Sequence, residues 1–335
     1  MSELISLGQF AVKKAEELGA YQAEAFVTKV RSVEVKTEKS ALKLARSIVD
    51  WGVGVRAFSR KGAMGYAYVT RFDEKLIEEA VRKAVKEANA GTEDPDFKSL
   101  PSPKEKGEVA DLFDPKVAEM ETDEVVELVL RAMDAAKLEK VYSINVDADA
   151  VSQEMAVVNS LGIERYQKLT LVGMGAEVSA KENGEMSSGF EFDYSRKLSD
   201  IKPEFVGEMA AREAVNSLRA KKIETKKMEV VFAPLALARI FEIGIGEGVD
   251  ADNIQRRRSY LCGRKGEQIG CELLTVYDDG TIPGGFGSFS FDAEGVSTRK
   301  KVLIEKGVLK GFIYDSYTAG KEGLESTGNA VRGEI

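Results

Sequence analysis

The sequence predicts an α+β fold with a duplicated helix–antiparallel sheet–helix N-terminal half and a β-rich C-terminal domain. Three observations predict it: the order helix, strands, helix occurs twice, glycine and alanine motifs recur between the two copies, and the last third carries mainly strand and turn signals. We therefore divide the 335 residues into a first α+β repeat over 1–95, a linker or loop over 96–116, a second α+β repeat over 117–222, and a β-rich C-terminal domain over 223–335.

The first repeat begins with a helix over residues 3–18, where apolar residues follow helical spacing and Gly19 suits the stop. From residue 23 to residue 70 the apolar period changes to two, which predicts strands, with a hairpin turn at Arg60-Lys61-Gly62. A helix over 74–90 closes the unit.

The same order follows a segment without periodicity, residues 92–116, which holds four of the seven prolines. Thr122 can cap a helix that runs to about residue 138. Strands are expected between residues 141 and 194, and a last helix over 203–220.

Residue matches support an internal duplication. Gly52-Val53-Gly54 corresponds to Gly173-Met174-Gly175 at an offset of 121, Gly62 and Met64 correspond to Gly184 and Met186 at 122, and the segment Ala80–Val85 corresponds to Ala210–Val215 at 130. Both glycine pairs lie within predicted strands, so they do not form a dinucleotide-binding loop, which needs strand, glycines and then helix.

The last third is predicted to open with a short apolar strand at residue 230 and a buried helix over 234–247, because a broad apolar stripe follows Pro234. Three glycines, Gly244, Gly246 and Gly248, fall in its last turns, and each costs about 1 kcal/mol inside a helix relative to alanine.

Two carboxylates, Glu242 and Glu247, lie among these glycines, and the pattern allows two interpretations. A helix that gives up stability beside acidic groups suggests a functional site. Alternatively, the glycines end the helix and Glu242 pairs with Arg239, three residues before it.

After this helix the chain shows a strand at 273–277 and a hairpin that turns at Glu305-Lys306-Gly307. Acidic turns at 278–281 and 292–295 could bind a hard cation, but they lack the dense ligand spacing of a calcium loop. Ordinary Asp-Gly turns are the favoured interpretation.

Composition excludes several classes of function. The chain has no histidine, which removes Ser-His-Asp and Cys-His catalysis and every zinc site built on histidine. A net charge of −8 argues against direct nucleic-acid binding. Two cysteines form no metal or disulfide framework, and the N-terminus lacks a signal peptide, so we expect a cytoplasmic protein with no membrane span.

The last third resembles the TldD/PmbA proteins, often called modulators of DNA gyrase. The likeness is carried by the segments 278–281, 292–295, 303–311 and 326–332, together with Asp315 and Ala319. The motif positions within it are Asp279, Gly280, Asp292, Gly295, Gly311, Thr327, Gly328 and Asn329.

The resemblance implies a dimeric peptidase that acts on peptides or unfolded proteins. In metal-bearing members a helix carries H-E-x-x-x-H and binds zinc, and a cysteine near the C-terminus adds a ligand. Alignment places Glu242 and Glu247 at the two histidines and Ile243 at the catalytic glutamate. This sequence departs from the motif at all three positions. It also ends before that cysteine, which leaves two alternatives open, a short chain or a truncated one.

We therefore expect a PmbA/TldE-like subunit without catalytic residues or cofactor of its own, whose TldD-like partner carries the zinc. One alternative is an autonomous peptidase with a carboxylate metal site at Glu242 and Glu247. Another is a homodimeric scaffold that captures extended peptides on a sheet edge.

Overall fold

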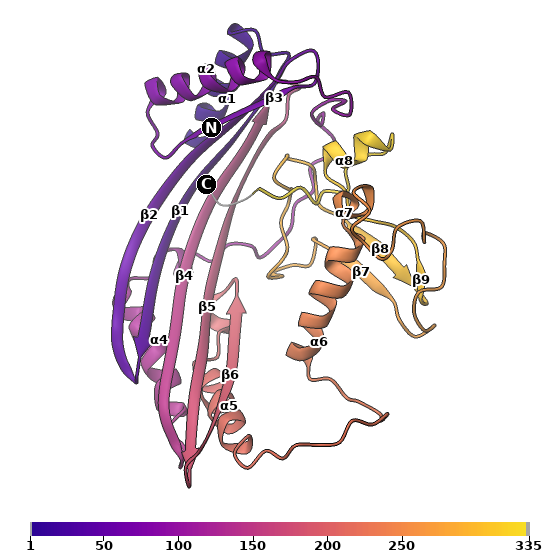
Figure 1. Ribbon diagram of the computed structural model, residues 1–335. Helices are drawn as coiled ribbons and strands as arrows, with labels where there is room; N and C mark the ends of the chain where they lie inside the picture. The colour runs from indigo at the N-terminus through magenta and orange to yellow at the C-terminus, as the bar shows by residue number, and fades with distance from the viewer. Residues whose placement is uncertain (1, 333–335) are drawn as a thin grey trace.

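A six-stranded antiparallel sheet forms the front half of the protein. In the computed structural model, which describes residues 2–332, its strand order is β3-β2-β1-β4-β5-β6 (Figure 1). The strands are β1 (Gln22–Glu38), β2 (Ala41–Phe58), β3 (Met64–Val69), β4 (Val141–Asn159), β5 (Glu164–Glu182) and β6 (Glu185–Ser195). The α+β class and the duplicated front half are confirmed.

Four helices cover one face of this sheet: α1 (Glu3–Glu17), α2 (Glu74–Ala90), α4 (Thr122–Ala135) and α5 (Pro203–Asn216). Alternate strand residues point toward them, so that Val53 and Val55 join the core under α1 and α2, while Val146 and Ala148 join the core under α4 and α5. The opposite, concave face is turned toward the last third of the chain (Figure 1).

The ladders establish the duplication residue by residue. Thr28 pairs with Gly52 in the first repeat and Asp149 pairs with Gly173 in the second, so β1 and β2 correspond to β4 and β5 at the predicted offset of 121. The two copies meet where β1 pairs with β4, which makes the sheet continuous and leaves β3 and β6 as its edges.

The third strand and second helix of each repeat also match. A Cβ at Gly65 would lie 1.9 Å from the main-chain oxygen of Ala84, and one at Gly189 would lie 2.2 Å from that of Ala210. The glycines therefore let helix and edge strand touch, and the true helix offset is 126. The predicted offset of 130 is wrong by about one helical turn, because alanines recur every four residues along these helices.

Most predicted elements of the front half are present, with two local corrections. The N-cap of α4 is Glu121, not Thr122, and it forms a capping box with Glu124. The separate strands expected after residue 141 form the single nineteen-residue strand β4. The short helices α3 (Pro115–Ala118) and η1 (Leu198–Asp200) complete this half.

The last third holds a three-stranded antiparallel sheet, short helices and long loops. The strands are β7 (Val276–Asp279), β8 (Lys300–Glu305) and β9 (Val308–Leu309), and the helices are α6 (Pro234–Phe241), η2 (Glu242–Gly246), η3 (Glu247–Val249), α7 (Ala251–Gln255) and α8 (Ser316–Lys321). The predicted hairpin is present, with Lys306 and Gly307 in its turn at positive φ.

Two predictions for the start of this region are wrong. Residues 230–232 belong to no strand, and the side chain of Val231 is 98% exposed. The helix at 234–247 is not buried, since Leu237, Ile240 and Ile243 on its apolar stripe are all exposed. It also changes geometry: α6 passes at Glu242 into the π-helical turn η2 and then into the 3-10 turn η3.

The helices of residues 2–332 include none that is both long and apolar enough to cross a bilayer.

Candidate functional site

Family-motif residues converge on a cavity of about 710 Å³ between the concave face of the sheet and the last third. The sheet supplies Phe26 and Trp51 among its lining residues. The last third supplies motif positions from three separate loops, namely Gly280, Asp292, and Gly328 with Asn329. We call this space the motif cavity.

Asp292 holds two of these loops together. One carboxylate oxygen accepts hydrogen bonds from the main-chain N–H groups of Glu294 and Val296, both at 2.9 Å, and the other accepts from Ala330 N at 2.9 Å. Burial raises the pKa of Asp292 to about 6, although these N–H donors oppose the shift. Its main role is to fix the loop that carries Asn329.

Asn329 in turn reaches the end of β7. Its Nδ2 donates to Asp278 Oδ2 at 2.8 Å, and Lys301 Nζ lies 2.6 Å from the same oxygen. Thr327 Oγ1 accepts from Tyr314 N at 2.7 Å and lies 2.7 Å from Asn329 Oδ1. An amide, a carboxylate and an ammonium group therefore form one connected polar wall of the cavity.

The remaining motif positions shape the backbone. Gly328 has a φ of +76°, and a Cβ there would lie 2.6 Å from Ser297 O. Gly295, with a φ of +77°, packs against Ile163 on the sheet side. Asp279 accepts from the hydroxyl and main-chain N–H of Thr281, and these bonds lower its pKa. A Cβ at Gly311 would meet no atom within 4 Å.

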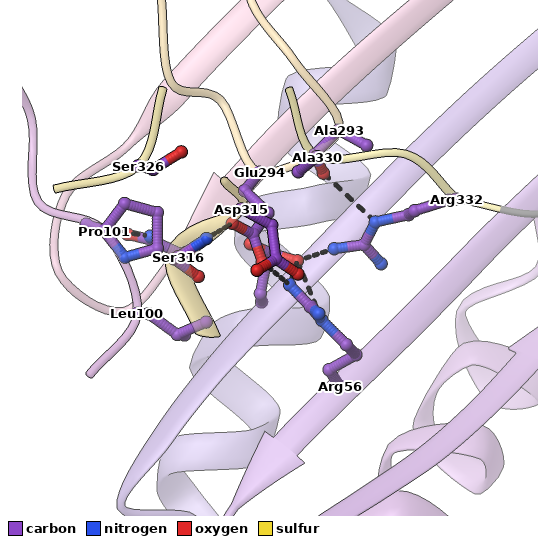
Figure 2. Close-up of polar contacts among 12 residues, drawn as sticks. Arg56, Leu100, Pro101, Ala293, Glu294, Asp315, Ser316, Ser326, Ala330 and Arg332 are labelled. Carbon is purple, nitrogen blue, oxygen red and sulfur yellow. Dashed lines mark hydrogen bonds and ion pairs between the residues drawn. The ribbon is translucent and has the colours of Figure 1, made fainter. Parts of the chain in front are cut away.

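A buried group of charges fixes the last third to the sheet beside the motif cavity. Arg56 Nη2 on β2 lies 2.8 Å from Glu24 on β1 and 3.0 Å from Glu294. Arg332 pairs with Glu24 and donates to Ala293 O at 3.1 Å. Figure 2 shows Arg56 and Arg332 pointing toward the same group of carboxylates. We call these four side chains the charge clamp.

The charge clamp balances two largely buried carboxylates against two partly buried guanidinium groups. Glu24 is 0% exposed, and burial lowers the pKa of Arg332 to about 10. Ser316 N, at the start of α8, donates to the second oxygen of Glu294 at 2.9 Å. Because a buried ion is costly without its partner, the clamp strongly favours one placement of the last third on the sheet.

Two further buried arginines, both from the second repeat, bind loops of the last third. Arg196 donates to the main-chain oxygens of Phe286 and Ser288, at 2.7 and 3.2 Å. Arg165 donates to Gly295 O at 3.3 Å and to Ser297 Oγ at 2.9 Å. The loops of the last third are thus bound to both repeats of the sheet.

Sequence patterns indicate only part of this arrangement. Glu294 and Arg332 fall within the segments that carry the family likeness, but Glu24 and Arg56 were missed. Both lie on strand positions that alternate with buried valine and alanine, so they read as solvent-facing residues. The feature of the sequence that could have indicated this group is Glu24, a single carboxylate within the apolar start of its strand.

Neither Glu242 nor Glu247 lines the motif cavity, and the two side chains do not share a site. Glu242 is exposed and pairs with Arg239 at 2.9 Å. Glu247 Oε2 accepts from Asn253 Nδ2 at 3.2 Å. The two side chains line different cavities: Glu242 faces the one beside β6, and Glu247 faces a smaller one with Asp250 and Asp315.

These residues do not fit a zinc site as they stand. A structural or catalytic zinc takes three or four converging protein ligands. Within residues 2–332, no group of three or more cysteine, aspartate or glutamate side chains is arranged to hold a metal ion. Glu242 and Glu247 each bind a neighbour of their own instead of converging on a common point.

Comparison with known proteins identifies the family. Models of the three PmbA/TldA metallopeptidase domains match residues 23–90 (domain 1), 115–218 (central domain) and 225–335 (C-terminal domain). The chain belongs to the PmbA/TldD family. It is 29% identical to the metalloprotease PmbA of Escherichia coli O157:H7 over 336 residues, covering 96% of this chain and 72% of that protein.

Two solved structures share the fold of this PmbA/TldD protein. TldE from Thermococcus kodakarensis superposes with a TM-score of 0.87 at 27% identity, over 97% of this chain and 73% of that one. A proposed modulator of a DNA gyrase from Thermotoga maritima gives a TM-score of 0.86 at 25% identity, over 98% and 75% of the two chains. The names of these relatives place the chain in a peptidase family in which metal is used.

Proposed function

We propose that this protein is the non-metal-binding, TldE-like subunit of a cytoplasmic peptidase complex, and that a TldD-like subunit carries the zinc. The observation that carries the proposal is the state of the two metal positions. Glu242 and Glu247 stand where the family resemblance places two histidines, and each is engaged by a neighbour instead of facing a common centre. This chain would then contribute a wall of the substrate space, bounded by the concave sheet and the motif cavity.

The exposed apolar surface around α6 supports the need for a partner. Phe232, Leu237, Ile240 and Ile243 are between 39% and 70% exposed along one short segment. Several exposed apolar side chains along one short segment typically mark a protein–protein contact. We propose that α6 and the residues before it contact the partner subunit, and that the substrates are peptides or unfolded proteins.

The domain limits remain part of the proposal. We place the repeats at 1–95 and 117–222, the linker at 96–116 and the C-terminal domain at 223–335. The separate family matches to 23–90, 115–218 and 225–335 support this division.

The test is reconstitution. The purified chain, a TldD-like relative from the same cell, and their mixture are each assayed for hydrolysis of an unstructured peptide, and complex formation is followed by size-exclusion chromatography. We expect a mixed complex and the highest activity in the mixture. Substituting Ile240→Asp should prevent complex formation, whereas Leu130→Asp, at an exposed leucine on α4, should not. Peptide hydrolysis by the lone chain would contradict the proposal.

A further inference from the structure

A second cavity, of about 780 Å³, lies on the concave face of the second repeat between the strands β4, β5 and β6 and the helix α6. Its volume is in the range of small-ligand and peptide side-chain sites. It shares no lining residue with the motif cavity. We call it the aromatic–acidic groove.

One wall of the groove is a row of aromatic rings on the edge strand β6. The ring centroids of Phe190 and Phe192 lie 5.8 Å apart, and those of Phe192 and Tyr194 lie 5.5 Å apart. Phe286, from the last third, extends the row at 5.4 Å from Tyr194. Phe190, Tyr194 and Phe286 are 41–59% exposed, so the row offers exposed aromatic surface against which a ligand could pack.

Two glycines lie under the rings, and one of them, Gly173, is needed for Tyr194 to keep its place. On β5, Gly175 pairs with Phe192 and Gly173 pairs with Tyr194. A Cβ at Gly173 would lie 2.3 Å from the Tyr194 ring, so only glycine lets the ring lie across the strand. The first repeat builds a shorter version, in which Tyr66 and Tyr68 stack at 6.2 Å.

The sheet surface beside the rings is acidic, and this feature belongs to the second repeat alone. Its carboxylates are Asp147, Asp149 and Glu177, none of which has a lysine or arginine nitrogen within 4.0 Å among residues 2–332. At the offset of 121, the first repeat has Phe26, Thr28 and Arg56 at these positions. Among residues 2–332, the one cation that lines the groove, Arg239, is already paired with Glu242, and Lys36, which acts on Asp149 from β1, is paired with Glu34.

We propose that the aromatic–acidic groove binds an extended peptide segment in which lysine or arginine side chains alternate with apolar ones. Carboxylates without partners would pair with the cations, and the ring row would pack against alkyl stems and apolar neighbours. We infer that the ligand is a peptide from the proposed function. We infer that it is positively charged from the carboxylates of the groove itself.

Recognition in the groove would use side chains, not strand addition. On the outer edge of β6 the N–H of Phe190 donates to Glu213 at 2.9 Å, and that of Phe192 donates to Glu191 at 3.0 Å. The equivalent N–H on β3, that of Tyr66, lies 3.4 Å from Glu87. Carboxylates thus occupy edge donors that an added strand would need.

Two fluorescein-labelled heptapeptides test the proposal by fluorescence anisotropy on the purified chain. One contains two lysines among glycine, alanine and leucine, and the other has glutamate in place of both lysines. We expect the lysine peptide to bind at least tenfold more tightly. Asp149→Asn combined with Glu177→Gln should raise its Kd about fivefold, the effect of losing partly exposed ion pairs.

The control variant combines Glu127→Gln with Glu208→Gln, which removes the same charge from the outer face of α4 and α5 and should leave the Kd unchanged. Phe192→Ala should weaken binding of the lysine peptide further. Equal binding of both peptides, no binding of either, or an unchanged Kd in the groove variant would overturn the proposal. Urea unfolding of each variant verifies that it is folded.

This assay separates the inference from the proposed function, because it needs neither metal nor a second subunit. Charge-selective binding without hydrolysis in the mixture would contradict the proposed function and leave the groove intact. Hydrolysis in the mixture without charge-selective binding would contradict the groove.

Discussion

Gly173 on β5 lies directly under the ring of Tyr194 on β6, its ladder partner. A Cβ at position 173 would approach the ring Cε1 to 2.3 Å, whereas one at Gly175, two residues along the same face, would come no closer than 3.6 Å to any neighbour. One of the two glycines in the predicted Gly-x-Gly motif is therefore required by packing, and the other is not.

This relationship predicts different costs for two similar substitutions. Gly173→Ala should lower the free energy of unfolding by about 2 kcal/mol, because it forces the Tyr194 ring from its place. Gly175→Ala should change it by less than about 0.5 kcal/mol. Urea unfolding measures both, and a double variant with Tyr194→Ala should recover most of the loss. Equal effects of the two single substitutions would contradict the packing account.

The contact between helix and edge strand predicts equivalent sensitivity in the two repeats. Gly65→Ala and Gly189→Ala each place a Cβ about 2 Å from a helix carbonyl oxygen, so each should cost about 3 kcal/mol or abolish folding. Gly311→Ala, where a Cβ meets no atom within 4 Å, is the control. Thermal unfolding compares the three, and tolerance of either repeat substitution would argue against the correspondence of Gly65 with Gly189.

The charge clamp predicts a large effect from one neutralised carboxylate. Glu24→Gln leaves Arg56 and Arg332 buried with less compensation, and should lower the free energy of unfolding by about 3 kcal/mol. Glu208→Gln breaks an exposed pair with Arg212 and should cost less than about 0.5 kcal/mol. If both variants unfolded at the same urea concentration, the clamp would not hold the two halves together.

The pH dependence of stability should report on Asp149. Burial raises its pKa to about 6, nearby Glu34 adds to the shift, and Lys36 opposes it. Because the folded pKa is above the ordinary 3.8, the folded state binds the proton more tightly, and Asp149 makes the protein more stable as pH falls from 7 toward 4.

Asp149→Asn should therefore be more stable than the wild type at pH 7, by about 1 kcal/mol once partial exposure is allowed for. It should also gain less stability between pH 7 and pH 5. Asp292, whose pKa is also raised to about 6, makes the folded state more stable as pH falls in both the wild type and the variant. Unfolding by urea at several pH values measures this, and parallel curves for the two proteins would refute the assignment.

Sequence periodicity predicted the front half well because its strands and helices bury one regular face each. The offset of 121 between the repeats is confirmed by the ladders, whereas the helix offset failed because the alanine spacing fits equally well one turn away. The apolar stripe of α6 predicted that the helix is buried. Amphipathicity shows only that one face of a helix is apolar, and no other part of residues 2–332 covers this face.

The candidate site was predictable only in part for a related reason. Motif residues in the last third could be found by their likeness to a family. Their partners Glu24 and Arg56 lie more than 230 residues away from Glu294 in sequence, and nothing local distinguishes them from solvent-facing strand residues. Such contacts depend on how the last third docks on the sheet.

Metal content tests the central claim most directly. The chain is purified alone and in complex with a TldD-like relative from the same cell, and zinc is measured in each by elemental analysis. The account predicts stoichiometric zinc in the complex, and only traces on the lone chain that do not change with Glu242→Gln or Glu247→Gln. Stoichiometric zinc on the lone chain, lost in either variant, would contradict it and make the two carboxylates a metal site.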